Sequence, residues 1–208
     1  MAQPDVILVN GCSSAGKSSI CRALQQALAA PHVLSGLDDF VFRLLPPQLH
    51  GTAAGVYFET LEDGSVPVRF GPAGQAMQRA FHRSVAEVAR AGLPVIVDEV
   101  ILGPELLEDW LVALNGLQVL FVGVRCDLEE LKRRELARGD RQPGQVQSHF
   151  QLVHAHGDYD VEVDTTRATT ADCVEQIRSV TATGAGASNA FDRLRTQAAL
   201  SPRRQTVR

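Results

Sequence analysis

The sequence lacks any long run of apolar residues. No stretch of its 208 residues approaches about 18 consecutive apolar side chains, roughly the length of a helix that spans a bilayer. A strand-like segment begins within a few residues of Met1, which leaves no room for a signal peptide. We therefore expect a cytoplasmic protein with no membrane partner.

The chain also lacks a large excess of either charge. Its formal net charge is −4 at pH 7. Such a balance gives no general electrostatic reason to bind nucleic acid or an anionic membrane surface. We therefore expect no nucleic-acid partner. The oligomeric state stays open, with a homo-oligomer among the alternatives.

Cysteine and histidine are few and scattered. The cysteines have no C-x-x-C spacing, so neither a zinc ribbon nor a disulfide framework is indicated, and we expect reduced thiols at Cys12, Cys21, Cys126 and Cys173. A helix N-terminus at Cys12 could lower the thiol pKa and make it alkylatable, but we favour a small filler residue there. His154-Ala-His156 is too isolated for a metal site, and we assign it to the surface or a loop.

What the sequence does contain is an alternation of buried strands and amphipathic helices. Nearly uniform apolar segments predict strands at 5–10, 32–35, 94–100, 117–126 and 159–166. Helical periodicity or helix-forming composition lies between and after them, at 17–28, 75–91, 105–114, 127–138 and 170–180. With 45% hydrophobic residues, the chain fits one α/β domain: a doubly wound parallel sheet of about five strands with helices on both faces.

Two segments depart from this alternation. Between about 47 and 74 the composition shifts to Gly, Pro, Thr and Asp, which predicts an insertion with a hairpin around Asp63-Gly64 and a substrate-specific surface. From about 182 a small-residue linker leads to one weakly amphipathic stretch with Phe191, Leu194 and Leu200. We expect residues 1–181 to form the domain, and 182–208 to be a flexible tail that is mostly disordered or loosely docked.

The pattern G-x-x-x-x-G-K-S lies between the first strand and the first helix. Its glycines allow backbone N–H groups to curl into an anion-holding nest at the positive end of the helix. The lysine can then reach the β- and γ-phosphates of a nucleotide as an exposed ligand, and the serine can bind the accompanying magnesium. The bland alternative is a β–α turn that binds nothing. We predict a nucleotide site at Gly11, Cys12, Ser13, Ser14, Ala15, Gly16, Lys17, Ser18 and Ser19.

Acidic residues close two other strands of the predicted sheet. Asp38 follows the second strand, and Asp98-Glu99 closes the third. In an open parallel sheet ligands bind at the carboxyl ends of the strands. Asp38 is therefore a candidate to accept a proton from an acceptor hydroxyl, and Asp98 to hold magnesium or its waters near Ser18. The competing interpretation is that Asp38 or Asp39 only caps the next helix.

The segment DLEELKRRELARGDR is strongly basic toward its end. Some of its charge is explained by pairing four residues apart along a solvated helix, as for Glu129 with Arg133 and Glu130 with Arg134. Arg138 and Arg141 have no acid four residues earlier on a clear helical register. With Arg134, they form a candidate lid that neutralises charge developing during phosphoryl transfer.

Several segments taken in order resemble the chloramphenicol phosphotransferase family of small P-loop kinases, over residues 5 to about 180. They are ILVNGCSSAGKSSI, SGLDDF…LLP, ARAGLPVIVDEVILG, VLFVGVRCDLEELKRRELARGDR and YDVEVDTT. The resemblance implies a P-loop kinase-type sheet with a lid, and transfer from ATP with Mg²⁺ to the primary hydroxyl of chloramphenicol. It puts the general base on Asp38, the phosphate loop on Gly11 to Ser18, and the lid arginines on the segment RRELARGDR.

The chain departs from the family in two places, which keeps other acceptors open. Residues 48–72 match it loosely, and the tail has no counterpart. The alternatives are a kinase of another small hydroxyl compound, such as shikimate, gluconate or a nucleotide sugar, and a nucleotide-binding module without transfer activity. Asp38 together with a basic lid favours transfer. The choice between ATP and GTP stays open.

Overall fold

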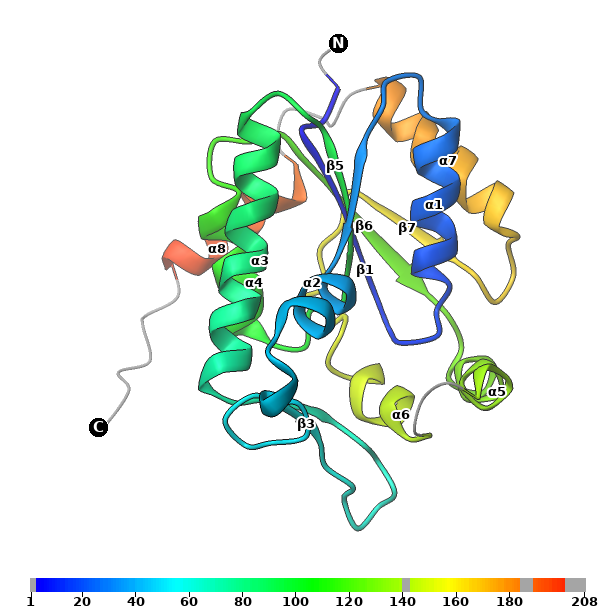
Figure 1. Ribbon diagram of the computed structural model, residues 1–208. Helices are drawn as coiled ribbons and strands as arrows, with labels where there is room; N and C mark the ends of the chain where they lie inside the picture. The colour runs from blue at the N-terminus through cyan, green and yellow to red at the C-terminus, as the bar shows by residue number, and fades with distance from the viewer. Residues whose placement is uncertain (1–2, 140–142, 184–188, 201–208) are drawn as a thin grey trace.

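The computed structural model describes residues 3–139, 143–183 and 189–200. Its centre is a five-stranded sheet with the order β2-β5-β1-β6-β7, in which every pairing is parallel (Figure 1). The strands are β1 (Val6–Gly11), β2 (Val33–Gly36), β5 (Val95–Glu99), β6 (Val119–Arg125) and β7 (Val161–Asp164). The predicted α/β fold with a doubly wound parallel sheet is confirmed.

The helices form a layer on each face of this sheet. One apolar core holds buried residues from α1 (Lys17–Ala27) and α7 (Thr170–Thr183). The other lies under α2 (Leu37–Leu44), α3 (Pro72–Arg90), α4 (Pro104–Ala113) and α8 (Ala190–Leu200). Because both faces are covered, all residues of β1 are buried, and its sequence is apolar until its polar end at Asn10-Gly11.

The carboxyl ends of the strands lie at one edge, where the remaining elements gather. In the register of the sheet, Val9 of β1 lies beside Asp98 of β5, and Asn10 lies between Glu99 and Gly123. Beyond this edge lie α5 (Leu128–Arg138) and α6 (Gln145–Phe150) (Figure 1). The sequence had not indicated α6, which is a short, mostly polar helix of six residues.

The predicted hairpin is present. It follows the short 3-10 helix η1 (Pro47–Leu49) and pairs β3 (Val56–Phe58) with β4 (Val68–Phe70) in antiparallel fashion. Its base is tight: a Cβ at Gly71 would lie 1.9 Å from the carbonyl oxygen of Ala53, so only glycine fits there. The N–H of Val66 donates to the carbonyl of Gly144, which joins the hairpin to the start of α6.

The C-terminal stretch corrects our expectation of a disordered or loosely docked tail, as far as residues 189–200 are concerned. They include α8, in which Ala190, Phe191 and Leu194 are buried. The Phe191 ring meets the Phe121 ring of β6 edge-on at 5.1 Å. The apolar periodicity of this segment was weak because only three small or apolar side chains of α8 are buried against the domain, while Leu200 stays exposed. Residues 184–188 and 201–208 of the expected tail lie outside the described residues.

Candidate active site

The phosphate loop turns sharply between β1 and α1. Gly16 and Ser14 have positive φ angles of 87° and 63°. A Cβ at Gly11 would lie 2.6 Å from the carbonyl oxygen of Val124, so β6 passes too close for any other residue. The Ser14 hydroxyl is buried and has no hydrogen-bond partner among the described residues. An orphaned polar atom in a loop at a helix N-terminus fits a site that awaits an anion.

Lys17 corrects one expectation, because its side chain is buried rather than exposed. Only 7% of it is accessible, although it lines the pocket. Its ammonium donates to the carbonyl of Cys12 at 3.0 Å and lies 3.8 Å from a carboxylate oxygen of Asp98. A buried charge needs such partners, so the loop itself supplies a place for the ammonium next to the anion nest.

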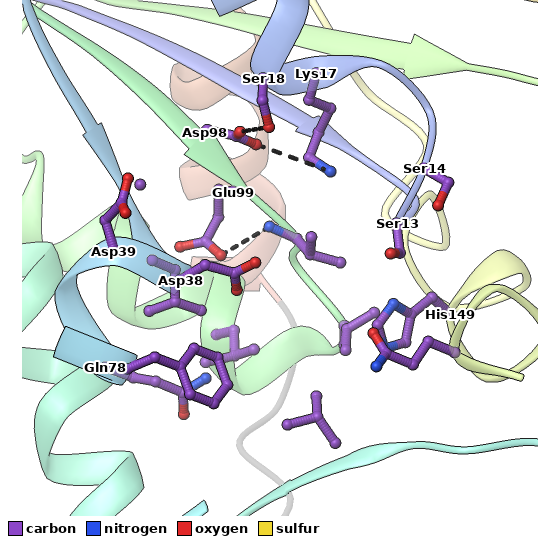
Figure 2. A pocket seen from close by; sticks show the side chains of 18 of the residues that line it. Ser13, Ser14, Lys17, Ser18, Asp38, Asp39, Gln78, Asp98, Glu99 and His149 are labelled. Atoms are coloured by element: carbon purple, nitrogen blue, oxygen red, sulfur yellow. Dashed lines mark hydrogen bonds and ion pairs between the residues drawn. The ribbon is translucent and has the colours of Figure 1, made fainter. Parts of the chain in front are cut away.

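Ser18 and Asp98 lie together, as the sequence predicted. The Ser18 hydroxyl donates to Asp98 Oδ2 at 2.5 Å, and Figure 2 shows both side chains beside Lys17. The pair joins the first turn of α1 to the end of β5. A hydroxyl and a carboxylate supply the oxygen ligands that Mg²⁺ prefers, so the donor set fits this metal.

Asp38 and Asp39 lie in the first turn of α2, and both line the pocket. The helix is capped by Gly36 without a side-chain cap hydrogen bond, so neither aspartate is the N-cap residue. Their carboxylates still favour the positive end of the helix. Figure 2 shows the Asp38 carboxylate turned toward the centre of the pocket and that of Asp39 turned away from it. Of the two, Asp38 has the geometry for chemistry on a bound acceptor.

The basic helix α5 is held by ion pairs that differ in part from those predicted. Glu130 binds both Arg133 and Arg134, each at 2.7 Å, whereas Glu129 binds Lys132 and not Arg133. Hydrogen bonds from Arg133 and then Arg134 lower the pKa of Glu130 to about 2. Part of the positive charge of α5 is therefore neutralised on the helix itself.

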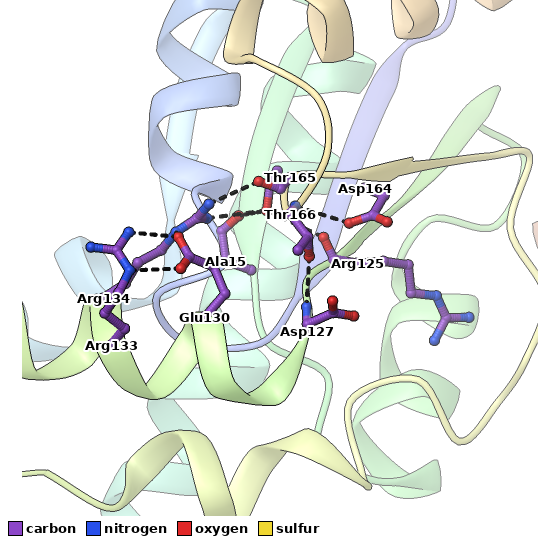
Figure 3. Close-up of polar contacts among 9 residues, drawn as sticks. All are labelled: Ala15, Arg125, Asp127, Glu130, Arg133, Arg134, Asp164, Thr165 and Thr166. Atoms are coloured by element: carbon purple, nitrogen blue, oxygen red, sulfur yellow. Dashed lines mark hydrogen bonds and ion pairs between the residues drawn. The ribbon is translucent and has the colours of Figure 1, made fainter.

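Arg134 is fixed against the phosphate loop. Its guanidinium donates to the carbonyl of Thr165 at 2.8 Å and to the Thr165 hydroxyl at 3.2 Å, and that hydroxyl donates to the carbonyl of Ala15 at 2.9 Å (Figure 3). A Cβ at Gly16 would be 3.9 Å from Arg134. Arg134 therefore joins α5, the end of β7 and the phosphate loop. Arg138 lines the same pocket from the end of α5, and Arg141 lies outside the described residues.

The thiol of Cys12 in the phosphate loop is buried. Cys12 is 2% exposed, and burial raises the pKa of its thiol to about 12. The interpretation as a filler residue is confirmed. All four cysteines are free and buried, so no disulfide forms.

A buried polar hub under the phosphate loop had not been foreseen. Asn10 donates to the carbonyl of Val153 and to the Tyr159 hydroxyl, and its oxygen accepts from the N–H of Ile101. His154 lies in a loop, as predicted, but it is half-buried, and its Nδ1 is 2.6 Å from the Tyr159 hydroxyl. The sequence signal that was available is a polar residue at the end of an apolar strand. The described residues contain no His, Cys, Asp and Glu cluster that could hold a metal ion.

One large pocket of about 1590 Å³ lies at the carboxyl edge of the sheet. The phosphate loop, Asp98 and the arginines of α5 line one side. The other side has an aromatic wall from α2 and the hairpin, formed by Phe42, Phe58 and Phe70. The rings of Phe42 and Phe58 stack at 6.5 Å. The pocket thus has the phosphate-loop motif and basic side chains on one side and aromatic rings on the other.

Residues 4–182 match the family model described as "Chloramphenicol phosphotransferase-like protein". The chain belongs to this family. It is 37% identical over 173 residues to the Mycobacterium tuberculosis H37Rv protein named "Putative O-phosphotransferase Rv2636", with 80% of this chain and 77% of that protein covered. The resemblance seen in the sequence is confirmed.

Solved structures share the fold. The APS kinase CysC of M. tuberculosis, solved with AMPPNP and APS, superposes with a TM-score of 0.62 at 14% identity, covering 88% of this chain and 100% of that one. A gluconokinase of Sinorhizobium meliloti 1021 gives 0.61 at 19% identity, covering 95% and 99%. The family member thus has the fold of a P-loop kinase, and family and fold together identify a phosphotransferase. No helix within residues 3–139, 143–183 and 189–200 has the length and apolar character to cross a membrane.

Proposed function

We propose that the protein transfers the γ-phosphoryl group of ATP to a hydroxyl group of a small molecule in the cytoplasm, with the primary hydroxyl of chloramphenicol as the first acceptor to test. One observation carries the proposal. A phosphate loop with Lys17, Ser18 and Asp98 shares a pocket with Asp38, whose carboxylate points to the pocket centre. A binding module has no need of a carboxylate at that point, whereas transfer to an alcohol does.

ATP and Mg²⁺ fit the residues on the phosphate side. The nest at Gly11 to Gly16, including the orphaned Ser14 hydroxyl, suits the phosphates, and Ser18 with Asp98 would hold the metal. When bound, Mg²⁺ neutralises charge on the phosphate oxygens. Lys17, already next to the loop, would move from Asp98 and the Cys12 carbonyl to the β- and γ-phosphates.

Asp38 is the proposed base. It accepts the proton of the acceptor hydroxyl while the new oxygen–phosphorus bond forms and ADP leaves with the electron pair of the broken bond. Arg134, fixed beside Gly16, and Arg138 stabilise the negative charge on the transferring group.

The acceptor is an organic molecule that suits an aromatic wall. Phe42, Phe58 and Phe70 fit the nitrophenyl ring of chloramphenicol, and the family description supports the same choice. A related kinase could instead phosphorylate shikimate, gluconate or a nucleotide sugar. The pocket volume of about 1590 Å³ accommodates any of these beside a nucleotide.

The test is mass spectrometry of acceptors incubated with the protein, ATP and Mg²⁺. We expect one added phosphoryl group on chloramphenicol and none on an analogue without the primary hydroxyl. Asp38→Asn should lower turnover by about two to four orders of magnitude. Asp39→Asn, the matched control one residue on, should keep most of it. If chloramphenicol is not phosphorylated but another alcohol is, in a way that depends on Asp38, chloramphenicol is refuted as the acceptor and the kinase activity is not. A broad panel without any product would favour the nucleotide-binding module.

A further inference from the structure

Glu99 is a buried carboxylate that the proposed transfer does not use. It follows Asp98 in β5, and because successive side chains of a strand point to opposite faces, it lies on the side of α3 and α4. Its side chain is only 2% exposed yet lines the pocket. The N–H of Val100 donates to Oε1 at 2.7 Å, and the indole N–H of Trp110 donates to Oε2 at 3.3 Å.

A histidine and a second carboxylate stand behind Glu99. His82 of α3 is 1% exposed, and its Nε2 lies 3.7 Å from Glu99 Oε2. Its Nδ1 lies 2.5 Å from Asp109 Oδ2 of α4, and the Trp110 ring packs on the imidazole with 4.0 Å between centroids. The ring is therefore held between two carboxylates, which fixes the orientation of Glu99 from behind.

Gln78 gives an independent indication of a ligand. It lies one turn before His82 on α3, lines the same pocket and is 5% exposed. Figure 2 shows its side chain among the residues that line the pocket with Asp38 and Glu99. A side-chain amide carries both a donor and an acceptor, so one that lines a pocket is suited to a ligand's polar group.

We infer that Glu99 and Gln78 form a subsite for a second hydroxyl group of the acceptor, so that the substrates are diols or polyols rather than simple alcohols. This rests on the proposed function, in which Asp38 takes the hydroxyl that is phosphorylated. The Glu99 carboxylate accepts the hydrogen bond of the second hydroxyl, and the Gln78 amide donates to its oxygen. His82 and Asp109 are positioning residues that act through Glu99.

A purely structural role for the Asp109–His82–Glu99 row would not explain why its carboxylates line the pocket. The row does join α3, α4 and β5, but a row that served only this purpose could lie entirely in the core. Here both carboxylates line the pocket, and Asp109 remains 27% exposed. An acceptor without the second hydroxyl would displace water from Glu99 and Gln78 without replacing its hydrogen bonds, which costs binding free energy.

Trp110 allows this subsite to be tested independently of turnover. It is the only tryptophan of the chain, and it touches both Glu99 and His82. Its fluorescence is titrated with two matched pairs of probes: chloramphenicol with its 1-deoxy analogue, and gluconate with 6-hydroxyhexanoate. In each pair the second member keeps the primary hydroxyl and lacks the additional hydroxyls. We expect the polyol of at least one pair to bind about tenfold more tightly than its partner.

The variants then locate the preference. Glu99→Gln and Gln78→Leu should each bring the ratio between paired probes close to one, with unchanged ATP affinity. Glu108→Gln, an exposed neighbour on α4 outside the pocket, is the control and should keep the ratio. Asp109→Asn and His82→Gln should raise the KM for the polyol about threefold or more, with kcat and the KM for ATP little changed. A merely structural role would instead lower the melting temperature and leave the ratio unchanged.

Three results overturn the subsite: equal binding of the two members in both pairs, no binding of either polyol, or a preference that survives in both Glu99→Gln and Gln78→Leu. Failure of the proposed function looks different. Polyol preference without phosphoryl transfer would refute the kinase assignment and support the subsite. Transfer to the members of both pairs, with equal affinity within each pair, would support the kinase assignment and refute the subsite. Asp38→Asn should lose turnover and keep the preference.

Discussion

The two sides of the pocket are built in different ways. The side that we propose for the phosphates is centred on one short turn between β1 and α1, with Asp98 and the arginines of α5 around it. This turn is closed on a neighbouring strand so tightly that a Cβ at Gly11 would lie 2.6 Å from a β6 carbonyl. The acceptor side is assembled from α2, the hairpin, α3 and α4, which span residues 37–113. Its aromatic wall and its buried carboxylate come from separate elements. The phosphate side therefore has little freedom to vary, and the acceptor side has much.

The largest effect that we expect is on turnover, after substitution of Lys17 on the phosphate side. Lys17→Ala should lower turnover by about two to three orders of magnitude, because one charge contact to the transferring group is lost. The ion pair with Asp98 means that the melting temperature must be measured on the same samples. Lys132→Ala, which removes an exposed lysine paired with Glu129, is the control. Wild-type turnover in a folded Lys17→Ala protein would contradict the phosphate site.

The hub under the phosphate loop gives a pH-dependent effect. Burial, followed by the charge of Arg125, lowers the pKa of His154 to about 4, from an ordinary value of 6.5. Between these values the unfolded chain binds more protons than the folded one, so stability is present above pH 6.5 and is lost as the pH falls toward 4. After allowance for partial exposure, we expect a loss of no more than about 2 kcal/mol.

Denaturant unfolding at pH 7 and pH 5 measures this loss. His154→Gln should flatten the difference between the two pH values, whereas His50→Gln, in the segment that precedes the hairpin, should not. If the free energy of unfolding of the His154→Gln protein falls as much between pH 7 and pH 5 as that of the wild type, His154 is not the cause of the pH dependence.

Substitution of the arginines of α5 tests whether this helix acts on the transfer step. Arg138→Ala should lower the rate of transfer about tenfold with less change in ATP affinity, because a lid cation acts on charge that develops during the reaction. Lys132→Ala on the same helix is the matched control, since that side chain is paired with Glu129 and lies outside the pocket. Arg141→Ala should behave as Arg138→Ala does. If neither Arg138 nor Arg141 changes turnover by more than about twofold, a solvated helix explains the segment.

The smallest expected effect is on Cys12. Because burial raises its thiol pKa to about 12, alkylating reagents should leave it unmodified in the folded protein at pH 7.5. Mass mapping of iodoacetamide-treated protein measures this. Rapid modification of Cys12 in protein that keeps its native melting temperature would show that the phosphate loop opens.

The sequence could predict features formed by neighbouring residues or by the general geometry of a parallel sheet, and not contacts specific to distant segments. The phosphate loop is contiguous, and the Ser18–Asp98 pair follows from parallel strands ending at one edge, so both were predictable. The anchoring of Arg134 to Thr165 and the docking of Phe191 on Phe121 depend on tertiary packing between distant segments, which no local period encodes. The same holds for the row from Asp109 to Glu99. Its one local signal was a second acid beside Asp98 in an otherwise apolar strand.

The bond between hairpin and α6 limits how the hairpin can change. Gly144 has a φ of 109°, and a Cβ there would lie 2.5 Å from the carbonyl of Gly64 at the hairpin turn. Glu135 of α5 accepts the N–H groups of Gly144 and Val146, so the same residues connect the turn to the basic helix. A change in the backbone or length of the hairpin therefore disturbs this contact and, through Glu135, the helix that carries Arg134 and Arg138. We expect substitutions of hairpin side chains at constant loop length to leave α5 in place.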